Sequence, residues 1–184
     1  GSLKASDVET LIGGTGSDTV TLLGSGIQVY AADIDTLVGT SGTDVLTLLN
    51  STPISVSSIE TVVGGAGLDG ITLLGGGTVA VSAVDSAVGT TSATDIVQLL
   101  ASPATNSLSV GNVETVVGST GTDIIVQMAA GTLSVSAVET VIGSTGSSDL
   151  LRLITAGDHV SLSAVDTVVG TGAGNSDAIV MLAT

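Results

Sequence analysis

The sequence predicts an all-β fold in which the chain winds into a stack of coils, a parallel β-solenoid. The first observation is a phrase that recurs seven times: an aliphatic residue, an acid, usually Thr, two aliphatic residues and a glycine turn closing on Asp. A fixed period of about 20–50 residues is the signature of solenoids, propellers and arrays. The second is strict apolar alternation between the turns, which indicates strands. The repeats are 25 to 29 residues apart and begin at Val8, Ile34, Ile59, Val84, Val113, Val138 and Val165.

The third observation is a composition of small residues. The 184 residues include 26 Gly but no Phe, Trp or Cys and a single Tyr, so large aromatic side chains do not fill the core. Stacked Val, Ile, Leu and Ala suit a narrow, repetitive interior. Hydrophobic residues make up 43% of the chain, which is far above the range of disordered segments.

Each repeat is expected to contain three short strands, as the fifth repeat illustrates. Strands are predicted at 113–117, 124–128 and 132–136, with glycine turns at 118–123 and 129–131 between them. At Ala137–Val138 two apolar residues adjoin and the alternation slips, which predicts a corner or bulge before the next repeat.

With one repeat per coil, the chain forms about seven coils of roughly three short strands each. Seven coils at about 4.8 Å make a rod of roughly 30–35 Å. We interpret residues 1–7 as a tag remnant and lead-in, and residues 8–184 as one solenoid.

Most of the acids fall at two positions of the repeat. We call the second residue of each repeat the opening acid and the residue that closes the glycine turn the turn aspartate. If equivalent positions stack in neighbouring coils, each set forms a ladder of carboxylates about 5 Å apart. The opening acids are Glu9, Asp35, Glu60, Asp85, Glu114, Glu139 and Asp166, and the turn aspartates are Asp18, Asp44, Asp69, Asp95, Asp123, Asp149 and Asp177.

Two interpretations of the turn aspartates stay open. They could bind Ca²⁺, which prefers carboxylate and carbonyl oxygens. They could equally accept N–H bonds within their own turns, as Asp often does. The opening acids alternate with apolar neighbours, so we expect them on a solvated outward face.

The turn resembles the hemolysin-type calcium-binding repeat of the RTX (repeats-in-toxin) family, G-G-x-G-x-D-x-U-x with U apolar. Residues 13–21 and 64–72 match every position, and residues 39–44 and 118–123 lose only the second glycine. RTX coils have about 18 residues, compared with about 25 predicted here. The resemblance implies Ca²⁺ at the turn aspartates, with backbone carbonyls of Gly13, Gly16, Gly39, Gly42, Gly64, Gly67, Gly118 and Gly121 as further ligands.

Two further features were weighed. A column of Thr (Thr10, Thr36, Thr61, Thr115, Thr140 and Thr167, with Ser86) could form a flat ladder of the kind seen in ice-binding proteins, but its apolar neighbours favour interior stacking. His159 has no Cys or second His near it in sequence, so we expect a solvated bend residue.

These patterns predict a structural role. No Ser–His–acid arrangement stands apart, so we expect no enzyme. The net charge of −15 disfavours nucleic acid and anionic membranes, and no apolar run is long enough for a membrane span. The RTX resemblance implies a secreted or cell-surface bacterial protein. We therefore expect a structural segment, such as an adhesin stalk, surface layer or filament, that self-associates end to end or adjoins neighbouring repeats. The alternative is a calcium-triggered folding or secretion module attached to a toxin or secreted enzyme.

Overall fold

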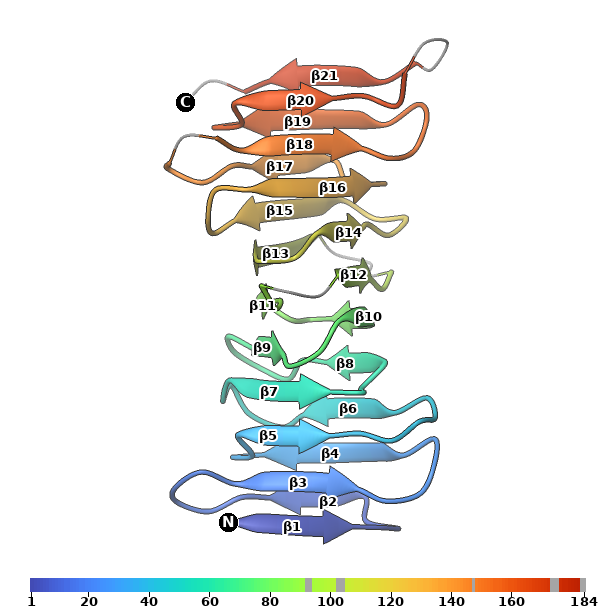
Figure 1. The fold of residues 1–184 in the computed structure, drawn as a ribbon, viewed down its shortest axis with the longest axis vertical. Coiled ribbons are helices and arrows are strands. Elements are labelled where there is room, and N and C mark those ends of the chain that lie inside the picture. The colour runs from blue at the N-terminus through green and yellow to red at the C-terminus, as the bar shows by residue number, and fades with distance from the viewer. Residues whose placement is uncertain (92–93, 102–104, 147, 173–175, 183–184) are drawn as a thin grey trace.

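The protein is a rod of two facing parallel β-sheets in a computed structural model (Figure 1). The structure describes residues 1–91, 94–101, 105–146, 148–172 and 176–182. Odd-numbered strands form one sheet of 11 strands, sheet A, and even-numbered strands form the other of 10, sheet B. The strands point in opposite directions at the two ends of Figure 1, so the rod twists about its long axis.

The strands are short because a turn follows every three to six residues. Those of sheet A are β1 (Ser2–Ala5), β3 (Thr19–Leu22), β5 (Thr36–Val38), β7 (Ile54–Ser57), β9 (Gly70–Leu73), β11 (Ser86–Val88), β13 (Asn106–Gly111), β15 (Asp123–Gln127), β17 (Thr140–Ile142), β19 (His159–Ser163) and β21 (Ala178–Met181). Those of sheet B are β2 (Thr10–Ile12), β4 (Gln28–Ala32), β6 (Val45–Leu48), β8 (Thr61–Val63), β10 (Gly77–Ser82), β12 (Asp95–Leu99), β14 (Thr115–Val117), β16 (Thr132–Ser136), β18 (Leu150–Leu153) and β20 (Thr167–Val169).

The parallel β-solenoid is confirmed, but the predicted coil is wrong. Each repeat does contain three strands, yet each coil contains only two, because every bend returns the chain to the opposite sheet. The chain therefore makes about ten coils rather than seven. Ser2 pairs with Thr19 and Thr19 with Thr36, a step of 17 residues per coil. Eleven strands at about 4.8 Å give a rod of roughly 48 Å, longer than predicted.

One repeat is one and a half coils, so equivalent strands of successive repeats alternate between the two sheets. The first strands of the first two repeats, β2 and β5, lie in sheets B and A respectively. Strand β1, within the expected lead-in, pairs with β3 and extends sheet A.

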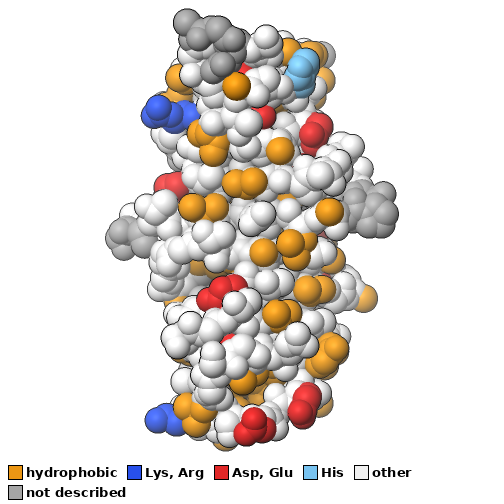
Figure 2. All heavy atoms as spheres, turned by 90° about the vertical axis from the view of Figure 1, so that its right-hand side faces the viewer, with side chains coloured by type: hydrophobic (Ala, Val, Ile, Leu, Met, Phe, Trp, Pro, Cys, Tyr) orange, Lys and Arg blue, Asp and Glu red, His pale blue; other side chains and the backbone are white. Residues whose placement is uncertain are grey.

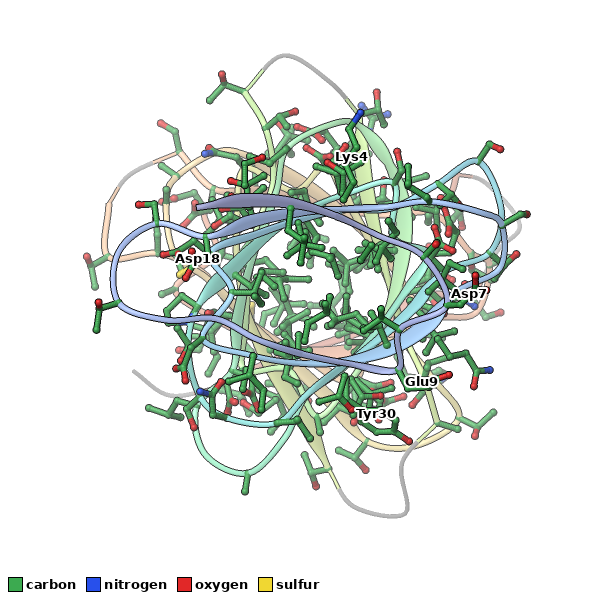
Figure 3. The ribbon with its side chains drawn as sticks, turned by 90° about the horizontal axis from the view of Figure 1, so that it is seen from below. Lys4, Asp7, Glu9, Asp18 and Tyr30 are labelled. Carbon is green, nitrogen blue, oxygen red and sulfur yellow. The ribbon has the colours of Figure 1, made fainter. Side chains whose placement is uncertain are left out.

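The core lies between the sheets and consists of the inward residues of every strand (Figure 3). In each three-residue first strand only the middle residue points inward, as Leu37 and Val116 illustrate with no exposed surface. The expected interior position of the Thr column is therefore wrong. Thr36 and its equivalents point outward, because residues on either side of an inward residue face the opposite way.

A tight corner links each repeat to the next, as the slip in alternation predicts. The residue before each repeat start has φ between 52° and 55°, the left-handed region. Asp and Asn tolerate this conformation better than other residues with a Cβ. The corner residues are Asp7, Asp33, Ser58, Ala83, Asn112, Ala137 and Ala164.

Candidate functional site

The turn aspartates lie where the second strand of each repeat begins, on alternating edges of the rod. Equivalents on one edge, such as Asp18 and Asp69, are three coils apart, roughly 14 Å at about 4.8 Å per coil. The predicted carboxylate ladder with 5 Å spacing is therefore wrong. Acidic side chains on one side of the rod accordingly appear as separate patches (Figure 2). The five central turn aspartates are almost completely buried: Asp44, Asp69, Asp95, Asp123 and Asp149.

Each turn aspartate accepts hydrogen bonds within its own turn. The residue after the first glycine donates its N–H to Oδ2, at 2.8 Å from Gly14 and 2.7 Å from Ser144. Where this residue is not glycine it is Thr or Ser, and its hydroxyl also donates to the carboxylate. Loss of the second glycine from the motif is therefore compensated by a hydroxyl donor. The residues that do this are Thr40, Thr90, Ser119, Ser144 and Thr171.

A second hydrogen bond joins neighbouring coils. The N–H of a turn aspartate donates to the carboxylate of the opening acid of the next repeat, at 2.7–2.9 Å. We call this bond the acid clamp. The opening acid precedes its strand at the corner rather than lying mid-strand, so the expectation of a merely solvated face is wrong. The clamped pairs are Asp18 with Asp35, Asp44 with Glu60, Asp69 with Asp85, Asp95 with Glu114, Asp123 with Glu139, and Asp149 with Asp166.

The first glycine of each turn makes room for the corner of the next repeat. A Cβ added to Gly118 would lie 1.7 Å from the carbonyl oxygen of Ala137, and the corresponding distance from Gly64 to Ala83 is 1.8 Å. No side chain fits at these distances. The N–H of Gly118 also donates to Ser136 O at 2.7 Å. The glycine, corner residue and acid clamp form one interlock between successive repeats.

The remaining oxygen of the turn aspartate, Oδ1, is satisfied in different ways. Asp44 Oδ1 accepts the N–H of Ile27 at 2.7 Å, and Asp123 Oδ1 accepts the side-chain amide of Asn106 at 2.7 Å. The buried Oδ1 atoms of Asp69 and Asp95 have no hydrogen-bond partner. At the aligned positions one coil away, these two aspartates face Thr52 and Gly77, which supply no donor.

The ionisation of three turn aspartates reflects these surroundings. Burial raises the pKa of Asp69, opposed by the Gly65 N–H and reinforced by the nearby charge of Asp85. The N-terminal ammonium of Gly1, 2.8 Å from Oδ1, lowers the pKa of Asp18, with help from the Gly14 N–H. The Thr171 N–H lowers the pKa of Asp177.

The surroundings of the turn aspartates suit N–H bonding better than calcium. Ca²⁺ requires about six to eight oxygen ligands, whereas these carboxylates face N–H and O–H donors. The described residues contain no group of three or more acidic, His or Cys side chains that could hold a metal ion. Of the glycines predicted as carbonyl ligands, Gly13, Gly39, Gly64 and Gly118 are the close-packed first glycines of the interlock. Gly42 and Gly121 donate their N–H groups to Thr40 and Ser119 hydroxyls, and Gly16 and Gly67 adopt positive φ.

His159 is the first residue of β19 and is exposed, so it lies on a strand rather than in a bend. The described part of the chain has no helix long and apolar enough to cross a membrane. Comparisons with family models, curated proteins and solved structures find no match. The coil of about 17 residues is nevertheless close to the step that the RTX resemblance implies, which removes the predicted difference in coil length.

Sequence reasoning identified the turn aspartates and opening acids but paired them wrongly. It also missed the corner residues and the hydroxyl donors as parts of the same unit. A signal was present, because the opening acid of one repeat follows the preceding turn aspartate by 16 to 19 residues, about one coil.

Proposed function

We propose that this chain is a structural, self-associating rod segment of a secreted or cell-surface bacterial protein, such as an adhesin stalk, surface layer or filament, without a catalytic role. The interlock carries this proposal. The same glycine, corner and acid clamp join every repeat to the next, and their donors and acceptors are used in holding coils together. Such repetition suits mechanical continuity along an axis.

The distribution of charge supports a load-bearing or packing role for the flat faces. Acidic residues lie at corners, in turns or at the first residue of a strand, leaving the outer faces of both sheets largely to Ser, Thr, Val and Ala. Lys4 and Arg152 are the cationic side chains in these strands. The acidic edges, with a net charge of −15, oppose non-specific association through like-charge repulsion.

The ends of the rod support association along the axis. Strands β1 and β2 pair on one side only, as do β20 and β21, so each end presents unpaired backbone groups that can template another strand. Multi-angle light scattering and electron microscopy over a wide concentration range test this proposal. Longer rods should form as concentration rises, whereas a strict monomer at every concentration and salt level would refute it.

The alternative function is a calcium-triggered RTX-like module, which the buried, unpartnered oxygens of Asp69 and Asp95 favour. Each of these atoms would gain a cationic partner. Circular dichroism melting with calcium and with EDTA distinguishes the two functions. The structural proposal expects the same β signal and melting temperature in both, while a calcium-dependent module unfolds or melts much earlier in EDTA. Calorimetric titration then gives the number of turns that bind.

A further inference from the structure

The two ends of the rod carry complementary halves of the interlock. The N-terminal end presents the opening acid Glu9, to whose carboxylate no N–H donates among the described residues, and the corner residue Asp7 (Figure 3). The C-terminal end presents the turn aspartate Asp177, and no acid follows it in the chain. At its first glycine, Gly170, an added Cβ would meet only atoms of Asp177. The first glycines of the other six repeats each face a corner carbonyl at 1.7–2.2 Å.

The strand types at the two ends also fit together. Strand β1 precedes the corner residue Asp7 as β4 precedes Asp33, so it has the position of a third strand of the repeat. Strand β21 follows Asp177 and has the position of a second strand. Within the rod, a third strand pairs with the first strand of its own repeat, and the next first strand pairs with the second strand, as β4 with β2 and β5 with β3.

On these grounds we propose that a second copy of this chain docks head to tail and is rotated by half a turn about the rod axis. This inference rests on the proposed self-association and gives it a specific geometry. Strand β1 of the second copy pairs with β20, and its β2 pairs with β21. The half turn is required because β1 belongs to sheet A and β20 to sheet B.

In this junction the interlock continues without a break. Glu9 of the second copy accepts the N–H of Asp177, and the Asp7 carbonyl lies against Gly170. The register of β5 on β3 places Leu11 of the second copy opposite Ile179, and Ile12 opposite Val180.

The end residues of the core support this contact. Ile179 and Leu3 occupy inward positions, since they pair with buried Val160 and Val20, yet they are 44% and 55% exposed. On the outer face, Ile12 and Val180 are 72% and 57% exposed. Docking covers apolar surface at both ends, which favours association.

Cysteine cross-linking tests the geometry, because the chain has no Cys of its own. Chains carrying Ile12→Cys are mixed with mass-tagged chains carrying Val180→Cys under mild oxidation. Neighbouring strands lie about 4.8 Å apart, within the range of Cα separations that disulfides span. The 12–180 heterodimer is expected as the main product. The control mixture replaces Val180→Cys with Val169→Cys, on exposed β20, which would lie near residue 12 if the copies stacked without rotation.

Glu9 variants test the clamp at the junction. Glu9→Ala should weaken association about 10-fold or more, because a hydrogen bond to a charged acceptor is lost. Glu9→Gln removes the same charge but keeps an acceptor, so it should retain most of the association. Both variants should melt like the parent, because the described residues donate no N–H to this carboxylate.

The outcomes separate this inference from the proposed function. Rods that associate but give the 12–169 product, or neither product, overturn the rotated junction and leave self-association standing. Equal association of Glu9→Ala and the parent also overturns the junction. A chain that stays monomeric in all conditions overturns both.

Discussion

Replacing Gly118 by Ala should disrupt the interlock between the fifth and sixth repeats. The new Cβ would lie 1.7 Å from the carbonyl oxygen of Ala137, 2.6 Å from its carbonyl carbon and 2.8 Å from Asp123 Oδ2. All three are far below ordinary contact distances, and the first two involve backbone atoms that cannot rotate away. The two coils must therefore move apart at this corner.

The cost follows from the bonds that such a movement breaks. The Gly118 N–H bond to Ser136 O and the acid clamp from Asp123 to Glu139 both cross this boundary, at 2.7 and 2.8 Å. A neutral hydrogen bond contributes about 0.5–1.5 kcal/mol, one to a charged group about 1.5–3 kcal/mol, and a buried group left unsatisfied costs more. We expect the free energy of unfolding to fall by about 3–5 kcal/mol.

Urea denaturation followed by circular dichroism measures this loss, and hydrogen exchange locates it. Exchange should accelerate first in β14 to β17, on both sides of the substituted corner. Gly75→Ala is the matched control, because an added Cβ there meets nothing within 4 Å and its φ is not positive. This control should change stability by less than about 1 kcal/mol. If Gly118→Ala were as stable as Gly75→Ala, the close-approach argument would be wrong.

Three further substitutions test other parts of the unit. Ala137→Gly should stabilise the protein by about 0.5–1 kcal/mol in thermal melts, because φ of 52° strains a residue with a Cβ; a destabilised variant would refute this. Asn106→Ala should destabilise by about 1–3 kcal/mol through loss of its bond to Asp123 Oδ1, whereas Thr52→Asn, at the aligned position near Asp69, should stabilise by supplying the missing donor. The raised pKa of Asp69 means that the folded state binds a proton more tightly than the unfolded state, so its contribution to stability falls as pH rises from about 4 towards neutrality. Asp69→Asn should flatten that part of the pH–stability curve, and an unchanged slope would count against the assigned burial.

The sequence predicts the local elements of the site well because their causes are local. Positive φ, glycine turns and alternation are encoded within a few residues, so the corner at Ala137 and the three strands of the fifth repeat appear close to their predicted positions. The Thr column was assigned to the wrong face because apolar residues flank it on both sides. In a three-residue strand only the middle residue faces the core, so its two flanking residues point outward whatever their polarity.

By itself, the sequence determined the sevenfold repeat, the strand and turn positions, and the acids and glycines that are used in the site. Only the tertiary structure decided how these parts meet. A repeat of three strands is compatible with a three-sided coil or with two sheets and one and a half coils per repeat, and the choice depends on how sharply each bend reverses the chain. Because the bends return the chain to the opposite sheet, Asp18 lies one coil from Asp35 instead of Asp44, and the acids pair through N–H groups rather than stacking as a ladder.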